Sequence, residues 1–185
     1  MLKDLPEWAK VAREQWTYWG QNRPPFAIMP EEGQESVWDY PRPPRLAPDH
    51  RPVVVRANGR ILAESHCTFR VLETASPPTF YIPPHDVDKN LLTLRARSSH
   101  CEWKGIAHYW CVNVNGIYLE DVGWSYLNPN PGFEVIAGYV AFYPGRVACY
   151  LDEELVSSQP GGLYGGWVTT EIVGPFKGEP GTQGW

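Results

Sequence analysis

The sequence predicts a mainly β protein in which an antiparallel sheet curls on itself. Two pairs of β-prone runs meet at Asn58-Gly59 and at Asn115-Gly116. Asn-Gly is the strongest short hairpin signal, because both turn positions need a positive φ. A third pair flanks Pro144-Gly145 and predicts a third hairpin. No long helical periodicity interrupts residues 52–156, so we expect the three hairpins to form one domain.

Alternation of side chains adds detail to the predicted strands. They cover residues 53–57 and 60–63, 109–114 and 117–119, and 139–143 and 146–150. In the second hairpin Tyr109 and Cys111 share one face, while Trp110 and Val112 share the other. Because both faces carry bulky groups, we expect a core to cover one side of these strands and an arm, a pocket or a ligand to cover the other.

A helix is expected near the N-terminus. Asp4 and Glu7 have the spacing of a capping box, and Pro6 suits the first helical turn. An apolar stripe then recurs at helical spacing over about four turns, formed by Trp8, Val11, Ala12, Trp16 and Trp19. The stripe predicts a packing face that docks on its own domain or on a second subunit.

Two segments lack sheet-like patterns. Residues 21–52 are rich in Pro, which favours extended backbone, so we expect an arm on the domain surface. Its Arg42 and Arg45 are interpreted as an anion clamp or as surface arginines stacked on aromatic rings. Residues 157–185 contain eight Gly and three Pro around one strand-like run, 167–173. This tail cannot form its own core, so it pairs with the domain or a partner, or stays loose.

Length and composition restrict the class of protein. With 185 residues, the chain has room for one domain with extensions: a lead over 1–35, a β domain over 36–156 and the tail over 157–185. The net charge of −5, without a cluster of Lys or Arg, argues against nucleic acid as a partner. Without a membrane-spanning run or a secretory signal pattern, we expect a cytoplasmic protein whose four cysteines are thiols.

No cofactor or metal is expected. His66-Cys67 and His100-Cys101 lack the close Cys pair of structural zinc sites. Neighbouring residues on a strand also point to opposite faces, which hinders joint ligation of a metal. No Gly-rich phosphate loop, nucleophile elbow or H-E-x-x-H motif is present.

The chemically richest stretch of the chain covers residues 99–116. It combines a thiol, imidazoles, an amine and indoles, as expected of a pocket with apolar walls and a few reactive or hydrogen-bonding points. Cys101 has His100 beside it and Lys104 three residues later, and nearby positive charge lowers the pKa of a thiol. Cys101 is therefore a candidate nucleophile.

Two further side chains are candidates for acid–base chemistry. Glu73 lies between apolar residues, where its carboxyl either pairs with Arg70 or another Arg or has a raised pKa. Tyr126 ends a predicted strand before an Asn/Pro turn and is a candidate pocket hydroxyl. The candidate catalytic residues are thus Glu73, Cys101, Lys104 and Tyr126.

Several segments in order resemble the family known as domain of unknown function 427, which is sometimes labelled nucleotidyltransferase-like. They are 38–44; 70–74 with 77–81 and 84–87; 100–105 with 107 and 109–110; and 124–126 with 136–143. The resemblance covers about residues 36 to 152 and implies a small antiparallel β domain whose curled sheet is a β-tent or open barrel. It implies no established biochemical role.

The resemblance also implies a set of pocket residues. Positions that match the family's shared residues are Glu73, Tyr81, Cys101, Trp103, Lys104, Tyr109, Trp124, Tyr126 and Tyr143. The nucleotidyltransferase label would require a Gly-Ser or Gly-Gly turn before paired acidic residues on a strand. Asp152-Glu153-Glu154 ends a predicted strand without such a turn, so the label is not adopted.

The leading hypothesis is a pocket that binds a small organic or aromatic ligand, with or without a reaction. The expected ligand-binding residues are Tyr81, Trp103, Lys104, Tyr109, Trp110, Trp124, Tyr126 and Tyr143. One alternative is a protein-interaction module, which forms a homo-oligomer such as a dimer through the N-terminal helix or the tail. Another is a thiol-dependent enzyme that uses Cys101.

Overall fold

The computed structural model describes residues 5–185 and shows a mainly β chain arranged in several antiparallel sheets. Within these residues none of the sheets closes into a barrel. In chain order the elements are α1 (Glu7–Glu14), β1 (Glu35–Ser36), η1 (Val37–Asp39), β2 (Arg45–Asp49), β3 (Val53–Ala57), β4 (Arg60–Ser65), β5 (Thr68–Glu73), β6 (Ser76–Tyr81), η2 (Lys89–Leu91), β7 (Leu92–Cys101), β8 (Gly105–Val114), β9 (Ile117–Tyr126), η3 (Glu134–Ile136), β10 (Ala141–Phe142), β11 (Ala148–Leu151), β12 (Glu154–Leu155), β13 (Ser157–Ser158), β14 (Trp167–Val168) and β15 (Ile172–Val173).

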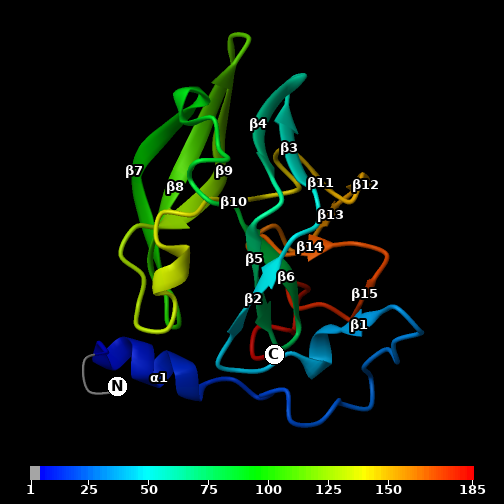
Figure 1. The fold of residues 1–185 in the computed structure, drawn as a ribbon. Helices are drawn as coiled ribbons and strands as arrows, with labels where there is room; N and C mark the ends of the chain where they lie inside the picture. The colour runs from blue at the N-terminus through cyan, green and yellow to red at the C-terminus, as the bar shows by residue number, and fades with distance from the viewer. Residues whose placement is uncertain (1–4) are drawn as a thin grey trace.

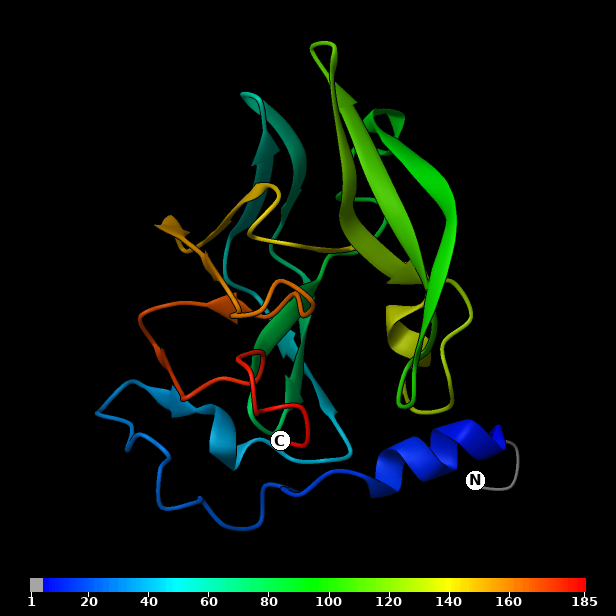
Figure 2. The ribbon, with the colours of Figure 1, turned by 180° about the vertical axis from the view of Figure 1, so that it is seen from behind.

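Two four-stranded sheets form the body of the domain. One has the strand order β10-β9-β8-β7 and the other β12-β11-β3-β4. Figure 1 shows them standing side by side, with the three-stranded sheet β2-β5-β6 below and between them. The short pairs β13-β14 and β1-β15 lie beneath the second sheet, and α1 lies below the end of the β7–β8 hairpin, as Figure 2 shows from behind.

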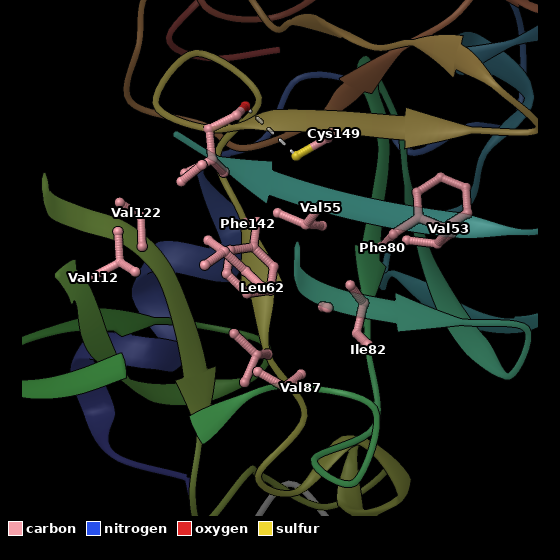
Figure 3. Packing of buried hydrophobic residues seen from close by; sticks show 14 of the residues in the cluster. Val53, Val55, Leu62, Phe80, Ile82, Val87, Val112, Val122, Phe142 and Cys149 are labelled. Atoms are coloured by element: carbon pink, nitrogen blue, oxygen red, sulfur yellow. Dashed lines mark hydrogen bonds between the residues drawn. The ribbon is translucent and has the colours of Figure 1, made fainter. Parts of the chain in front are cut away.

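The main hydrophobic core fills the space between the two larger sheets. Val112 and Val122 of one sheet face Val55 and Leu62 of the other, with Phe142 between them (Figure 3). All five side chains are fully buried. This packing explains why both faces of the strands carry bulky groups. One face of β8 and β9 packs in this core, and the opposite face contributes aromatic side chains to a second hydrophobic cluster.

The first two predicted hairpins are confirmed, but the third is wrong. Asn58 and Asn115 adopt φ of 46° and 53° at the β3–β4 and β8–β9 turns. Pro144-Gly145 supplies no positive φ, and the chain crosses between sheets there: β10 pairs with β9, whereas β11 pairs with β3. β11 instead forms a hairpin with β12 through residues 152–153, which adopt the positive φ of a hairpin turn without Asn or Gly. Two further hairpins, β5–β6 and β7–β8, were not predicted.

The N-terminal helix is shorter than predicted. It ends at Glu14, so Trp16 and Trp19 follow it as irregular chain, while Asp4 lies outside the described residues. The predicted apolar stripe is also wrong in part, since Trp8 is 44% exposed. The helix docks on its own domain through a Trp8–His100 ring contact and a hydrogen bond from Arg13 Nε to the Glu102 carbonyl (2.8 Å).

The Pro-rich segment is more than a surface arm. Its Trp38 is buried and packs with Val37, Tyr40 and Leu72 in a third cluster, and β2 pairs along β5. The tail forms two short strands rather than one: β14 pairs with β13, which is itself the start of the tail, and β15 pairs in parallel with β1. Trp167 of β14 packs in the main core, so the tail is docked on the domain. Across residues 5–185, no helix is both long and apolar enough to span a bilayer.

Candidate functional site

A cavity of about 400 Å³ opens between the β5–β6 hairpin and the sheet of β7, β8 and β9. Side chains from the turn after β7, from the chain after α1 and from the tail complete its walls. The predicted residues that line it are Glu73, Tyr81, Cys101, Trp103, Lys104, Tyr109, Trp124, Tyr126 and Tyr143. Residues from widely separated segments therefore converge on one hollow.

Strand register explains why the aromatic side chains share a face. Tyr109 pairs with Trp124 across β8 and β9, and Ala107 pairs with Tyr126 two residues further along. Directly opposed residues project to the same side of a sheet, so all four line the cavity. Trp110 is the exception among the predicted residues. It lies on the opposite face of β8, packs against the main core and donates from Nε1 to Ser125 Oγ (2.6 Å).

The aromatic wall is held by hydrogen bonds between its polar tips. Trp124 Nε1 donates to the Tyr81 hydroxyl (3.2 Å), and the hydroxyls of Tyr109 and Ser99 share a bond of 2.8 Å. Burial raises the pKa of Tyr81 to about 12 and raises that of Tyr126 well above its ordinary value. These phenols stay protonated at neutral pH, where they act as hydrogen-bonding groups with apolar rings.

The turn after β7 places Trp103 and Lys104 in the wall. Gly105 adopts a φ of 100°, and a Cβ there would lie 3.1 Å from Asn130 Oδ1. Asn130 Nδ2 donates to the Trp103 carbonyl (3.1 Å), and its backbone N–H donates to the Lys104 carbonyl (3.0 Å). A residue distant in sequence thus fixes the turn that presents both side chains.

The charge on Lys104 is stable despite its burial. Desolvation lowers the pKa of this amine, but the acidic groups around it, Cys101, Tyr81, Glu73 and Glu102, together outweigh that effect and leave the pKa above its ordinary value. Within residues 5–185 the ammonium forms no ion pair with a carboxylate. Lys104 is therefore a cation available to a ligand.

Glu73 pairs with an arginine, but not with Arg70. Arg42 Nε lies 3.3 Å from Glu73 Oε1, and the Arg42 guanidinium also stacks 4.4 Å from the centre of the Trp16 ring. Arg70 instead pairs with Glu35 and Asp49. Arg42 therefore stacks on an aromatic ring, as one of the two interpretations of this residue expected, but it is buried and not at the surface. Arg45 is exposed.

Sequence reasoning missed the part of the wall that comes from the chain ends. These residues are Trp16, Gln159, Leu163, Tyr164, Gly165 and Lys177. Trp16 donates from Nε1 to Glu102 Oε1 (3.0 Å), and the Lys177 ammonium lies 3.3 Å from the centre of its ring. Trp16 belongs to the predicted helical stripe, and the tail is Gly-rich without a periodic pattern, so no local pattern links either one to the cavity.

The described residues offer no ready metal site, since no three His, Cys, Asp or Glu side chains cluster among them. Cys101 lies in the cavity wall and accepts a weak hydrogen bond from the Lys104 backbone N–H (3.5 Å). No histidine within 5–185 forms a hydrogen bond with its sulfur. The arrangement can therefore hold an apolar body against rings and an acidic group against an amine.

Gly165 sets how closely the tail approaches the cavity wall. A Cβ at this position would overlap the Trp124 ring, with Cζ3 2.6 Å away. We expect Gly165→Ala to lower the free energy of unfolding by about 1–3 kcal/mol, because the tail or the indole must move. Near-ultraviolet circular dichroism should change as Trp124 shifts, and urea unfolding measures the loss.

The matched control is Gly145→Ala. Its Cβ would lie 3.5 Å from Ser158, an ordinary contact, so its effect should stay within about 0.5 kcal/mol. Equal stability of the two variants would contradict the close packing of the tail on Trp124.

Comparison with known proteins identifies a family for the chain. No curated protein matches the chain. One family model, NTP_transf_9, described as Domain of unknown function (DUF427), matches residues 45–153. This match covers more than half of the chain and includes every strand from β2 to β11. The chain therefore belongs to the DUF427 family.

Proposed function

We propose that the protein binds a small organic ligand with an aromatic or apolar body and an anionic group. The observation that carries the proposal is the convergence of Tyr81, Trp103, Lys104 and Tyr126 on one cavity. Its volume of about 400 Å³ suits a ligand of small-molecule size. Rings from three strands and two turns supply the apolar walls that such a ligand needs.

The anionic group of the ligand follows from the charges in the wall. Glu73 is already paired with Arg42, and Glu102 accepts from Trp16. The Lys104 ammonium lacks such a partner within the described residues, and a buried cation gains from a counter-ion. A carboxylate, sulfonate or phosphate on the ligand would supply it.

The alternatives have less support. Both α1 and the tail contact the rest of the same chain, α1 through Arg13 and the tail through Trp167 and β15, so neither is a free surface that requires a second subunit. A thiol-dependent reaction at Cys101 needs a general base, and none of the described histidines hydrogen-bonds to the sulfur. Ligand binding uses the same residues without that requirement.

A fluorescent aromatic anion tests the proposal. We expect 1-anilinonaphthalene-8-sulfonate to bind at one site per chain, with enhanced emission, because its rings suit the aromatic walls and its sulfonate suits Lys104. Lys104→Met should weaken this binding roughly 10–100-fold, as expected for the loss of a charge-assisted hydrogen bond. Calorimetric titration gives both stoichiometry and affinity.

Two controls separate specific binding from adhesion to exposed apolar surface. Lys89→Met removes an exposed lysine outside the cavity and should leave the affinity unchanged. The uncharged analogue N-phenyl-1-naphthylamine should bind the Lys104→Met variant and the unaltered protein equally well. If Lys104→Met binds the sulfonate as tightly as the unaltered protein, the proposed site is wrong.

A further inference from the structure

Lys177 is a second cavity lysine, and the backbone rather than its ammonium holds it in place. Its backbone N–H donates to the Ala75 carbonyl (2.8 Å), and its carbonyl accepts from Gln159 Nε2 (2.7 Å). The residue is only 2% exposed, and it lines the cavity beside Trp16 and Tyr164. The tail therefore places an amine in the cavity wall. Within the described residues its Nζ forms no hydrogen bond and no ion pair that a reaction would have to break.

The surroundings of this ammonium are mostly aromatic. Nζ lies 3.3 Å from the centre of the Trp16 ring and 5.0 Å from that of Tyr164. The charged and titratable groups that act on it are Arg42, Glu73, Glu102 and Cys101. Both carboxylates already have other partners, since Glu73 pairs with Arg42 and Glu102 accepts from Trp16. No carboxylate within residues 5–185 forms an ion pair with Lys177.

The two cavity lysines differ in their proton affinity. Burial, with a further contribution from Arg42, lowers the pKa of Lys177 to about 8, although Glu73 and Glu102 oppose this change. The pKa of Lys104 is raised instead. At neutral pH one amine is a stable cation, while the other is neutral in an appreciable fraction of molecules. Amines desolvated in this way are effective nucleophiles toward carbonyl carbons.

We propose that Lys177 Nζ forms an imine with the carbonyl carbon of the ligand while Lys104 holds the anionic group of the same ligand. This inference rests on the proposed function and names its ligand class, a small aldehyde or ketone that carries an acidic group. The geometry that supports it is one cavity with an unpaired amine in the tail wall and an unpaired ammonium in the wall after β7.

The step needs no co-reactant. The neutral amine adds to the carbonyl carbon, the π electrons of the C=O bond move to oxygen, and the nitrogen proton passes to that oxygen to give a carbinolamine. Loss of the hydroxyl group with a second nitrogen proton releases one water and leaves a C=N bond. The aromatic surroundings favour this loss, because they exclude the bulk water that would reverse it.

The test uses 4-formylbenzoate, which has an aromatic ring, an aldehyde and a carboxylate, together with cyanoborohydride. Cyanoborohydride delivers hydride to the imine carbon and fixes the adduct as a secondary amine. Peptide mapping should place one adduct on Lys177, formed roughly a hundredfold faster at pH 7.5 than on exposed lysines, since far more of its amine is neutral. The initial rate should rise with pH and level off above about 8.

Four variants refine the assignment. Lys177→Met should abolish the fast adduct, and Lys177→Arg should do the same while keeping a cation over Trp16. Lys104→Met should keep the adduct on Lys177 but raise the half-saturating aldehyde concentration roughly tenfold. Lys89→Met, at an exposed position, should react like the unaltered protein.

An analogue without a carbonyl, 4-(hydroxymethyl)benzoate, separates the two proposals. If this alcohol quenches tryptophan fluorescence while the aldehyde modifies only exposed lysines or Lys104, the proposed imine at Lys177 is wrong and the proposed binding site stands. If neither compound binds or reacts at the cavity, both proposals fail. Mapping of the unaltered protein needs no variant, so a variant that fails to fold does not affect this outcome.

Discussion

Arg42→Met should lower the free energy of unfolding by about 3–5 kcal/mol, because it leaves a partly buried carboxylate without its partner. The Arg42 side chain is fully buried, and that of Glu73 is 18% exposed. The guanidinium also donates to the carbonyls of Tyr18 (2.7 Å) and Thr74 (2.9 Å). One side chain therefore ties the chain after α1 to the β5–β6 turn, and urea unfolding measures its removal.

Two further substitutions test this explanation. Arg45→Met, at an exposed site three residues away, should change the stability by no more than about 0.5 kcal/mol. Glu73→Gln in the Arg42→Met background should restore part of the loss, because it removes the unpaired charge. The explanation is wrong if Arg42→Met is as mild as Arg45→Met.

Trp167→Ala should cost about 3–5 kcal/mol, as expected for truncation of a large buried side chain. Trp167 has no exposed surface and packs against Phe80 with ring centres 4.8 Å apart. Its Nε1 donates to the Phe142 carbonyl (3.1 Å), so the substitution also leaves a buried acceptor unpaired. Thermal and urea unfolding should both report the loss.

The matched control is Trp8→Ala on α1. Trp8 is 44% exposed and has one edge-to-face contact, with His100, so its removal should cost about 1 kcal/mol or less. Equal losses for the two tryptophans would mean that the tail contributes no more to the core than a surface helix does.

Much of the fold was predictable because its turns have local causes. Asn-Gly supplies the positive φ at two hairpins, and these turns then set the register of β3–β4 and β8–β9. The crossover at Pro144-Gly145 was not predictable, because partner choice between β9 and β3 depends on packing between sheets. Helical spacing also could not reveal that α1 ends at Glu14 and that Trp16, just beyond it, bonds to Glu102 in the cavity wall.

The cavity residues that lie on strands were predictable from the sequence. Tyr109, Trp124 and Tyr126 share a face through register, and the family resemblance pointed to the turn of Trp103 and Lys104. Trp110 was misplaced because its indole suggested a wall residue although strand alternation put it on the other face. Lys177 lies in a Gly- and Pro-rich stretch where no periodicity links it to the cavity.

Two residues that line the cavity, Trp16 and Lys177, lie outside the matched family segment of 45–153. A relative with the same strands but different chain ends would keep the aromatic wall of the cavity and would lack the Lys177 amine and the Trp16 indole. The shape and charge of the cavity would then differ among such proteins through their chain ends, while the sheet stays the same.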